Sequence, residues 1–192
     1  HPIYVGNRSE EFILRLSGSD YKEIENNGGG ITSSLQKLRN ATDDDLFTSS
    51  KNNILPFIKC GTTTIEAKSG YGQTLKDEVR SLEVIKKLND VLSIDIIPTF
   101  LGAHIIPPEF SNNKSEYIKL ICNEMIPEIS EKKLAKFCDV FCEEGYYNVD
   151  ESRLILNTAK EYGLIPRLHA DEFKYSGAAE LASEVNAISA DH

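Results

Sequence analysis

Five apolar, β-prone runs along the chain each lead into a side chain that can do chemistry. Segments with helical periodicity separate these runs, so they are expected to form parallel strands with their polar ends on the same side of one sheet. A parallel α/β enzyme keeps its active site at that edge. One histidine there is at least as often structural, but five such strand ends in succession are hard to explain by packing. The predicted strands are 62–68, 94–101, 137–142, 165–169 and 187–190, and the residues at or after their ends are Lys68, His104, Glu143, His169 and Asp191 with His192.

The segments between these strands predict helices. Apolar residues recur at helical spacing in the first of them, at Leu75, Val79, Leu82, Ile85 and Leu88. Asp150 is expected to cap the third helix, and Gly163 to end it. The predicted helices cover 75–91, the stretch around 116–129, 150–162 and 177–185.

The chain before the first strand predicts short helices joined by turns. Thr42, followed by three aspartates, is a good helix start. That helix is expected to run to about Lys59, broken or kinked near Pro56 and ended by Gly61. The glycine triplet at 28–30 allows either a simple turn or a close approach of the backbone to a ligand.

The spacing of the strands points to a barrel. Each strand and helix together take roughly 30 to 40 residues, which suits either a (β/α)₈ barrel or a doubly wound sheet. Chemistry at nearly every strand end favours the barrel, because an open sheet concentrates its site at one switch point. Four complete units and a fifth strand do not close a barrel of eight. The sequence therefore predicts one α/β domain, an incomplete segment of a TIM barrel.

Composition narrows the class of protein. With 40% hydrophobic residues the chain can bury a core, and its net charge of −9, without a basic block, argues against a nucleic-acid partner. No apolar stretch approaches the roughly 20 residues that cross a bilayer, and the first residues do not read as a signal peptide. The cysteines lie in apolar contexts without a disulfide-scaffold pattern, so buried thiols in a reducing cytoplasm are favoured over a metal role. They are Cys60, Cys122, Cys138 and Cys142.

The strongest local motif is LHADE at 168–172. A neutral imidazole such as that of His169 is a good ligand for zinc or iron. The carboxylate of Glu172, three residues later in the loop, can reach the same small volume as an acid or base. The alternative interpretation is that His169 caps the following helix.

Four further side chains each allow two interpretations, one as part of a functional site and one as a purely structural residue. Tyr71, between two glycines, either forms a wall of the site or belongs to a turn. His104 follows two small residues and either meets a ligand or is structural. Arg8 either lies on the surface or binds a substrate carboxylate with its planar guanidinium group. Lys68 is either catalytic or held in an ion pair with a strand-end acid.

Taken together, these motifs resemble imidazolonepropionase, the amidohydrolase of histidine degradation, over essentially the whole chain. Each motif is moderately specific, but their order and density are highly specific. SGYG, GAH and LHADE together separate this family from other amidohydrolases. The matching segments are GNR with Arg8, NGGGI at 27–31, GTTTIEAKSGYG at 61–72, TFLGAHIIPPEF at 99–110, DVFCEEG at 139–145, LHADE at 168–172 and SADH at 189–192.

The resemblance implies a (β/α)₈ barrel with a smaller β-rich domain built from both chain ends, and one zinc or iron ion at the barrel mouth. His169 matches one metal ligand, and His1 resembles the second histidine of an His-x-His pair, whose members face the same side of a strand. The first histidine of that pair and a later aspartate have no counterpart here. Residues 1–192 are therefore expected to be part of the catalytic barrel domain, without the small domain, and to be inactive alone.

The implied reaction is hydrolysis of the imidazolone ring of 4-imidazolone-5-propanoate to N-formimidoyl-L-glutamate by a metal-activated water. By resemblance, Glu172 contacts the substrate and carries a proton to the ring nitrogen, while His192 assists the water or the developing oxyanion. Arg8, Tyr71 and His104 match substrate-binding positions. Arg8 and Tyr71 would suit the propanoate carboxylate, and His104 a ring or carboxylate oxygen.

Two other functions stay open. One is a related hydrolase acting on another cyclic amide, which is disfavoured because Arg8, Tyr71 and His104 anticipate a carboxylated substrate. The other is a non-enzymatic binding module. The resemblance also leads us to expect a cytoplasmic homodimer, and it gives neither Lys68 nor Glu143 a role.

Overall fold

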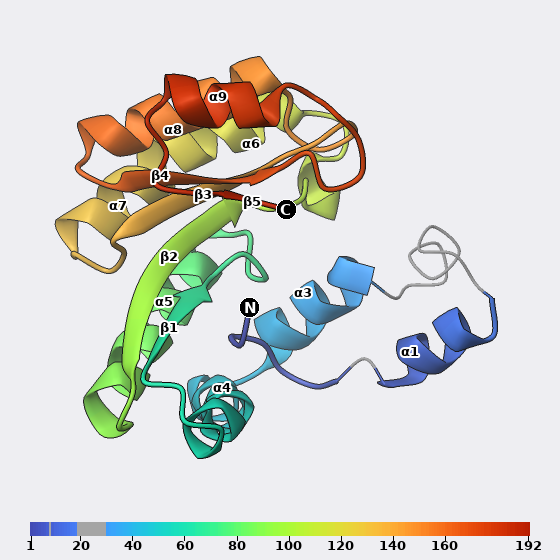
Figure 1. Ribbon diagram of the computed structural model, residues 1–192, viewed down its shortest axis with the longest axis vertical. Helices are drawn as coiled ribbons and strands as arrows, with labels where there is room; N and C mark the ends of the chain where they lie inside the picture. The colour runs from blue at the N-terminus through green and yellow to red at the C-terminus, as the bar shows by residue number, and fades with distance from the viewer. Residues whose placement is uncertain (8, 19–29) are drawn as a thin grey trace.

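A computed structural model describes residues 1–7, 9–18 and 30–192. At its centre is one five-stranded sheet in which every neighbouring pair is parallel and the strands stand in chain order (Figure 1). The strands are β1 (Thr64–Lys68), β2 (Asp95–Ala103), β3 (Phe137–Cys142), β4 (Ile165–Ala170) and β5 (Ala190–Asp191). The helices are α1 (Ser9–Leu16), α3 (Gly30–Asn40), α4 (Asp43–Lys59), α5 (Leu75–Val91), α6 (Lys114–Leu120), α7 (Ile126–Glu131), α8 (Val149–Glu161) and α9 (Ala178–Glu184), with a 3₁₀ turn η1 (Pro108–Phe110) and a π-helical turn η2 (Ile121–Met125).

The strand order identifies the architecture. Helices connect each strand to the next, as parallel neighbours require. A doubly wound sheet reverses its strand order at a switch point, whereas this order is continuous and the sheet curls like one side of a barrel (Figure 1). The prediction of a partial (β/α)₈ barrel with about five strands is therefore confirmed. Among the residues that the structure describes, no further strand pairs with the outer edge of β1 or β5.

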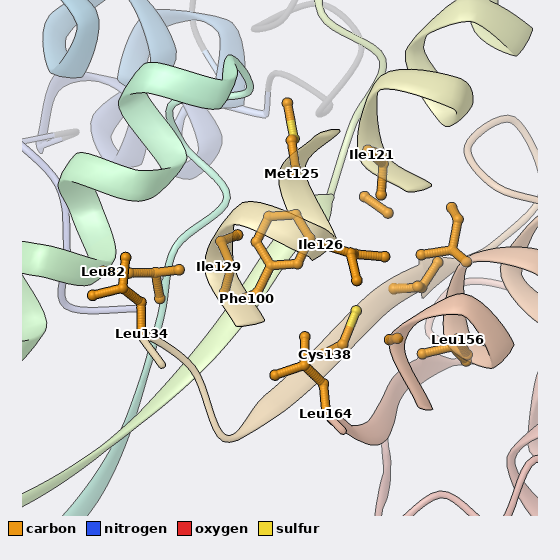
Figure 2. Close-up of a cluster of buried hydrophobic side chains, with 14 of the residues drawn as sticks. Leu82, Phe100, Ile121, Met125, Ile126, Ile129, Leu134, Cys138, Leu156 and Leu164 are labelled. Atoms are coloured by element: carbon orange, nitrogen blue, oxygen red, sulfur yellow. The ribbon is translucent and has the colours of Figure 1, made fainter. Parts of the chain in front are cut away.

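An apolar layer between the strands and the helices forms the core. Successive side chains of a strand point to opposite faces, and Phe100 of β2 and Cys138 of β3 point to the helices. The same cluster holds Met125 of η2 and Leu156 of α8, and all four side chains are fully buried (Figure 2). Burial of this layer fixes the sheet against its helices, and it leaves the opposite face of the strands for polar side chains.

The start of α8 and the course of α4 differ from the prediction. Asn148, not Asp150, caps α8, because Asn148 accepts from the backbone N–H of Glu151 and the Glu151 carboxylate accepts from that of Asn148, both at 2.9 Å. Helix α4 runs through Pro56 without a break. Pro56 lies in the last turn, and its carbonyl still accepts from the N–H of Cys60 at 3.0 Å.

The last strand and one cysteine also differ from the prediction. Strand β5 is shorter than the expected 187–190, because the backbone N–H of Ala187 still bonds to the carbonyl of Ala182 at the end of α9. Cys60 is exposed, whereas the other three cysteines are buried free thiols as expected. Cys60 follows the last turn of α4, where the chain leaves the core.

The N-terminal region contains the two short helices α1 and α3, in agreement with the prediction. Arg8 and the glycines at 28 and 29 lie outside the described residues, so the roles expected for them stay predictions. None of the helices in the described ranges has the length and apolarity that crossing a membrane requires.

Candidate active site

A cavity of about 260 Å³ lies at the ends of β2 and β4, beside the loop after β1. Larger hollows lie elsewhere in the described residues. One of about 630 Å³ lies between α4 and the edge of β1, one of about 620 Å³ beside the loop after β3, and one of about 500 Å³ beside the start of α4. We take the smaller cavity as the candidate site, because all four histidines of the chain line it and ligand sites need converging polar groups. The predicted residues in its lining are His1, Tyr71, His104, His169, Glu172 and His192.

His169, near the end of β4, is held by a carboxylate behind it. Its Nδ1 lies 3.0 Å from Oδ2 of Asp139, and its backbone N–H donates to Oδ1 at 3.1 Å. Burial raises the pKa of the Asp139 carboxyl, but the hydrogen bond and charge of His169 and the charge of Lys68 lower it more, so the group is an ionised acceptor. Nδ1 of His169 therefore donates its hydrogen, and Nε2 carries a lone pair.

Nε2 of His169 faces a second histidine. The Nε2 atoms of His1 and His169 are 3.4 Å apart. Two nitrogens that each lie about 2.0 to 2.1 Å from a tetrahedral zinc ion are about 3.3 Å apart, so this pair fits two ligand positions. Imidazole nitrogens also suit iron. Within 1–7, 9–18 and 30–192, no group of three or more His, Cys, Asp or Glu residues could hold a metal ion.

His104 is buried and neutral. Its Nδ1 lies 3.0 Å from the carbonyl oxygen of Gly70, and a carbonyl can only accept, so Nδ1 carries the hydrogen. Burial, assisted by the charge of His169, lowers the pKa of His104 to about 4 against the opposing effect of the Gly70 carbonyl. The ring stacks on His1 with centroids 5.4 Å apart, and Tyr71 meets it edge-on at 5.4 Å. His104 therefore presents a bare Nε2, which can only accept a hydrogen bond.

The neutral His104 predicts a pH dependence of stability. Its pKa is about 4 in the folded protein and about 6.5 when unfolded, so between these values only the unfolded chain binds the proton. Stability is therefore full above pH 6.5 and falls as the pH drops toward 4, by about 2 kcal/mol at pH 5. In the metal-free protein, His104→Gln should lose correspondingly less stability than the wild type between pH 7.5 and 5, measured by urea unfolding. Equal losses in the two proteins would contradict this.

Glu172 and His192 lie on the more open side of the cavity. Oε2 of Glu172 is 3.6 Å from Nε2 of His192, and both residues are exposed. Gly177 is the N-cap of α9, and the carboxylate of the preceding Asp171, not His169, accepts from the backbone N–H groups at 178 and 179. The interpretation of His169 as a helix cap is therefore wrong, and the loop after β4 turns Glu172 toward the cavity.

Curated relatives align with the chain from its first residue to its last. The imidazolonepropionases of Geobacillus kaustophilus and Brevibacillus brevis are each 48% identical to it over 192 residues, which is 100% of this chain and 45% of each relative. The chain is a homologue of imidazolonepropionases. It spans slightly less than half the length of these relatives.

One solved structure supports the fold. The crystal structure of 5-methylcytosine deaminase from Klebsiella pneumoniae, liganded with phosphonocytosine, matches with a TM-score of 0.66 at 16% identity. The match covers 96% of this chain and 42% of that chain. At this identity it shows the shared α/β barrel segment and nothing about chemistry. No profile of a known family matches the chain.

Behind the cavity, charged side chains of neighbouring strands form a layer. Nζ of Lys68 lies 2.5 Å from Asp139, 3.2 Å from Asp191 and 3.7 Å from Glu66. Burial lowers the pKa of Lys68, but these carboxylates, Asp139 first, raise it more, so the side chain stays a cation. Of the two interpretations of Lys68, the ion pair is confirmed.

Sequence reasoning missed three residues of this charged layer, namely Glu66, Asp139 and Arg167. The guanidinium of Arg167 lies 3.4 Å from Glu66, which extends the layer across the sheet. Each of the three lies inside a run that was interpreted as apolar. The sequence contains a pattern that predicts two of them. Glu66 stands two residues before Lys68, and Arg167 two residues before His169, so each pair shares one face of its strand.

Glu143, which the resemblance left without a role, binds the loop after β4. Its Oε2 accepts from the backbone N–H of Phe173 at 2.9 Å, and its Oε1 from that of Glu144 at 3.0 Å. Phe173 directly follows Glu172, so Glu143 holds the loop that carries the candidate acid or base.

Proposed function

We propose that this chain forms about half of the catalytic barrel of an imidazolonepropionase, which hydrolyses 4-imidazolone-5-propanoate to N-formimidoyl-L-glutamate. In this reaction water adds to the ring carbonyl carbon, the bond from that carbon to the adjacent ring nitrogen breaks, and the nitrogen takes up a proton. The observation that supports the proposal most is the gathering of all four histidines, Tyr71 and Glu172 around one cavity in a homologue of these enzymes.

His1 and His169 are the residues of this chain that would hold a divalent ion, zinc or iron. The separation of their Nε2 atoms and the carboxylate of Asp139 behind His169 support this assignment. When bound, the ion would activate a water molecule and polarise the ring carbonyl. Asp139 keeps the hydrogen of His169 on Nδ1, so that Nε2 is available as a ligand.

Glu172 is the residue that we assign to proton transfer. An exposed carboxylate on the open side of the cavity can take a proton from water and give it to the ring nitrogen. His192, 3.6 Å away, would assist the water or the oxyanion. The bare Nε2 of His104 suits a ring N–H better than an oxygen, which changes the role expected for it. Arg8 and Tyr71 stay the proposed partners of the propanoate carboxylate.

We also infer that residues 1–192 are a partial barrel domain of a longer protein, with the small β-rich domain outside them. The 45% coverage of the relatives supports this, as do the outer edges of β1 and β5, which pair with no further strand in the described residues. From the resemblance we also propose a cytoplasmic homodimer without a membrane partner. The net charge of −9 supports the further proposal that nucleic acid is not a partner.

A ring-opening assay on the metal-loaded full-length protein tests the proposed function. We expect it to turn over the imidazolone and not a guanine- or dihydropyrimidine-type ring, while residues 1–192 alone are inactive. Turnover of another cyclic amide, with none of the imidazolone, would overturn the proposal.

Glu172→Gln in the same full-length protein is expected to lower kcat roughly 10²- to 10⁴-fold, because glutamine keeps the shape of the side chain but cannot transfer the proton. The metal content should be unchanged, since Glu172 is not one of the proposed ligands. Steady-state kinetics and metal analysis measure both. Glu161→Gln, at the exposed end of α8, is the control and should behave like the wild type.

A further inference from the structure

We propose that Glu78 is a positioning residue of the candidate site. Its carboxylate holds the loop 69–73, which brings Tyr71 to the cavity and sets the tautomer of His104 through the carbonyl of Gly70. The inference rests on the proposed function for its kinetic part, and on the contacts of Glu78 for its structural part.

The carboxylate of Glu78 is completely buried in the first turn of α5, where backbone N–H groups of the preceding loop converge on it. Its Oε2 accepts from Gly70 at 2.9 Å. Its Oε1 accepts from Gly72 at 3.0 Å and from Gln73 at 2.7 Å. Three backbone donors on one side chain fix the path of a loop of five residues, because a buried carboxylate is stable only when its oxygens are bonded.

The loop has a shape that it would not adopt without such an anchor. Gly70 has a φ of +107°, and a Cβ there would lie 2.7 Å from the carbonyl oxygen of Leu101. Gln73, which is not glycine, has a φ of +56°, a left-handed conformation that is unfavourable for residues with a Cβ atom. The N–H groups that point at Glu78 compensate for this cost.

The same loop supplies two contacts of the site. The carbonyl of Gly70 accepts from Nδ1 of His104 at 3.0 Å. The ring of Tyr71 lies edge-on to His104 at 5.4 Å and to His1 at 5.9 Å. Without the anchor, the carbonyl of Gly70 could turn away, which would allow the hydrogen of His104 to move to Nε2. Glu78 therefore acts on the site from a distance, through the loop, without lining the cavity.

The test uses Glu78→Gln in the full-length, zinc-loaded protein, with Glu83→Gln as the matched control on the exposed face of the same helix. The backbone N–H of Gly70 lies 2.9 Å from Oε2 and 3.2 Å from Oε1, whereas Gly72 and Gln73 bond to Oε1 alone. The glutamine amide nitrogen cannot accept a hydrogen bond, so the variant loses either the shorter bond from Gly70 or the bonds from Gly72 and Gln73. We expect an unchanged zinc content, a KM for the imidazolone raised about tenfold and a smaller change in kcat, because the loop contributes to substrate binding. Nitrogen-15 spectra of the histidine rings should show the hydrogen of His104 on Nδ1 in the wild type and partly on Nε2 in the variant.

A double variant separates positioning from general stability. If Glu78 acts through Tyr71, then Glu78→Gln should add much less to KM in a Tyr71→Ala background than in the wild type. A Glu78→Gln protein with a lower melting temperature but the wild-type KM and the wild-type tautomer of His104 overturns the proposal, since the carboxylate would then be purely structural.

A failure of the proposed function is distinguishable from a failure of the positioning role of Glu78. If the wild-type protein does not open the imidazolone, the proposed function is wrong, and the tautomer of His104 in Glu78→Gln still decides whether Glu78 positions the loop. An unchanged tautomer in that case overturns the positioning role as well.

Discussion

Replacing His169 with asparagine is expected to remove both the metal and the activity of the full-length protein. Asp139 holds the His169 ring by Nδ1, so Nε2 is the atom that is offered to the ion. The shorter asparagine side chain cannot bring a ligand atom to the same point. We expect metal content to fall to less than about a tenth of the wild-type value, since ligand count and geometry set affinity. Ring-opening should fall by roughly 10³-fold or more, because the activated water is lost.

Metal analysis after gel filtration measures the loss of metal. Steady-state kinetics measure the loss of ring-opening activity. His192→Asn is the matched control, because His192 lines the same cavity but is not a proposed ligand. That variant should keep its metal while losing activity. A His169→Asn protein with full metal content would contradict the assignment of His169 as a ligand, whatever its activity.

Replacing Lys68 with methionine is expected to lower the free energy of unfolding by about 3–5 kcal/mol. The reason is that Asp139, which is fully buried, would keep its negative charge without the ammonium group 2.5 Å away. Urea unfolding compares the variant with the wild type. Lys86→Met, on the exposed face of α5, is the control and should change stability little.

A second variant identifies the unpaired charge as the cause. Combining Lys68→Met with Asp139→Asn removes both charges, and we expect this protein to be more stable than Lys68→Met alone. If the double variant is the less stable of the two, then the destabilisation by Lys68→Met comes from lost packing of the lysine methylene groups and not from the unpaired carboxylate of Asp139. Because Asp139 orients His169, the double variant should also bind metal more weakly than the wild type.

Much of the fold could be predicted because it depends on local patterns. Apolar, β-prone runs predicted the strands, and helical spacing of apolar residues predicted α5 over the same residues that the structure gives. One error lies where two neighbouring residues compete for one role. Asn148 and Asp150 are both good helix caps, and only the direction of the incoming chain selects Asn148.

The candidate site was predicted in part for the same reason. His104 and His169 could be found because parallel strands bring their ends to one edge of the sheet. Asp139 could not be assigned as the partner of both Lys68 and His169, because it is separated from them by 71 and 30 residues and lies inside an apolar run.

The sequence by itself determined the order of strands and helices, the side of the sheet that carries chemistry and the residues that gather there, because periodicity and chain order encode these features. Only the tertiary structure decided which atoms of those residues are available to a ligand. The contacts of Asp139 and Gly70 leave Nε2 free on His169 and His104, and the anchor at Glu78 shapes the loop that bears Tyr71. Such contacts depend on the register of the strands and on the packing of distant segments, which no local pattern specifies.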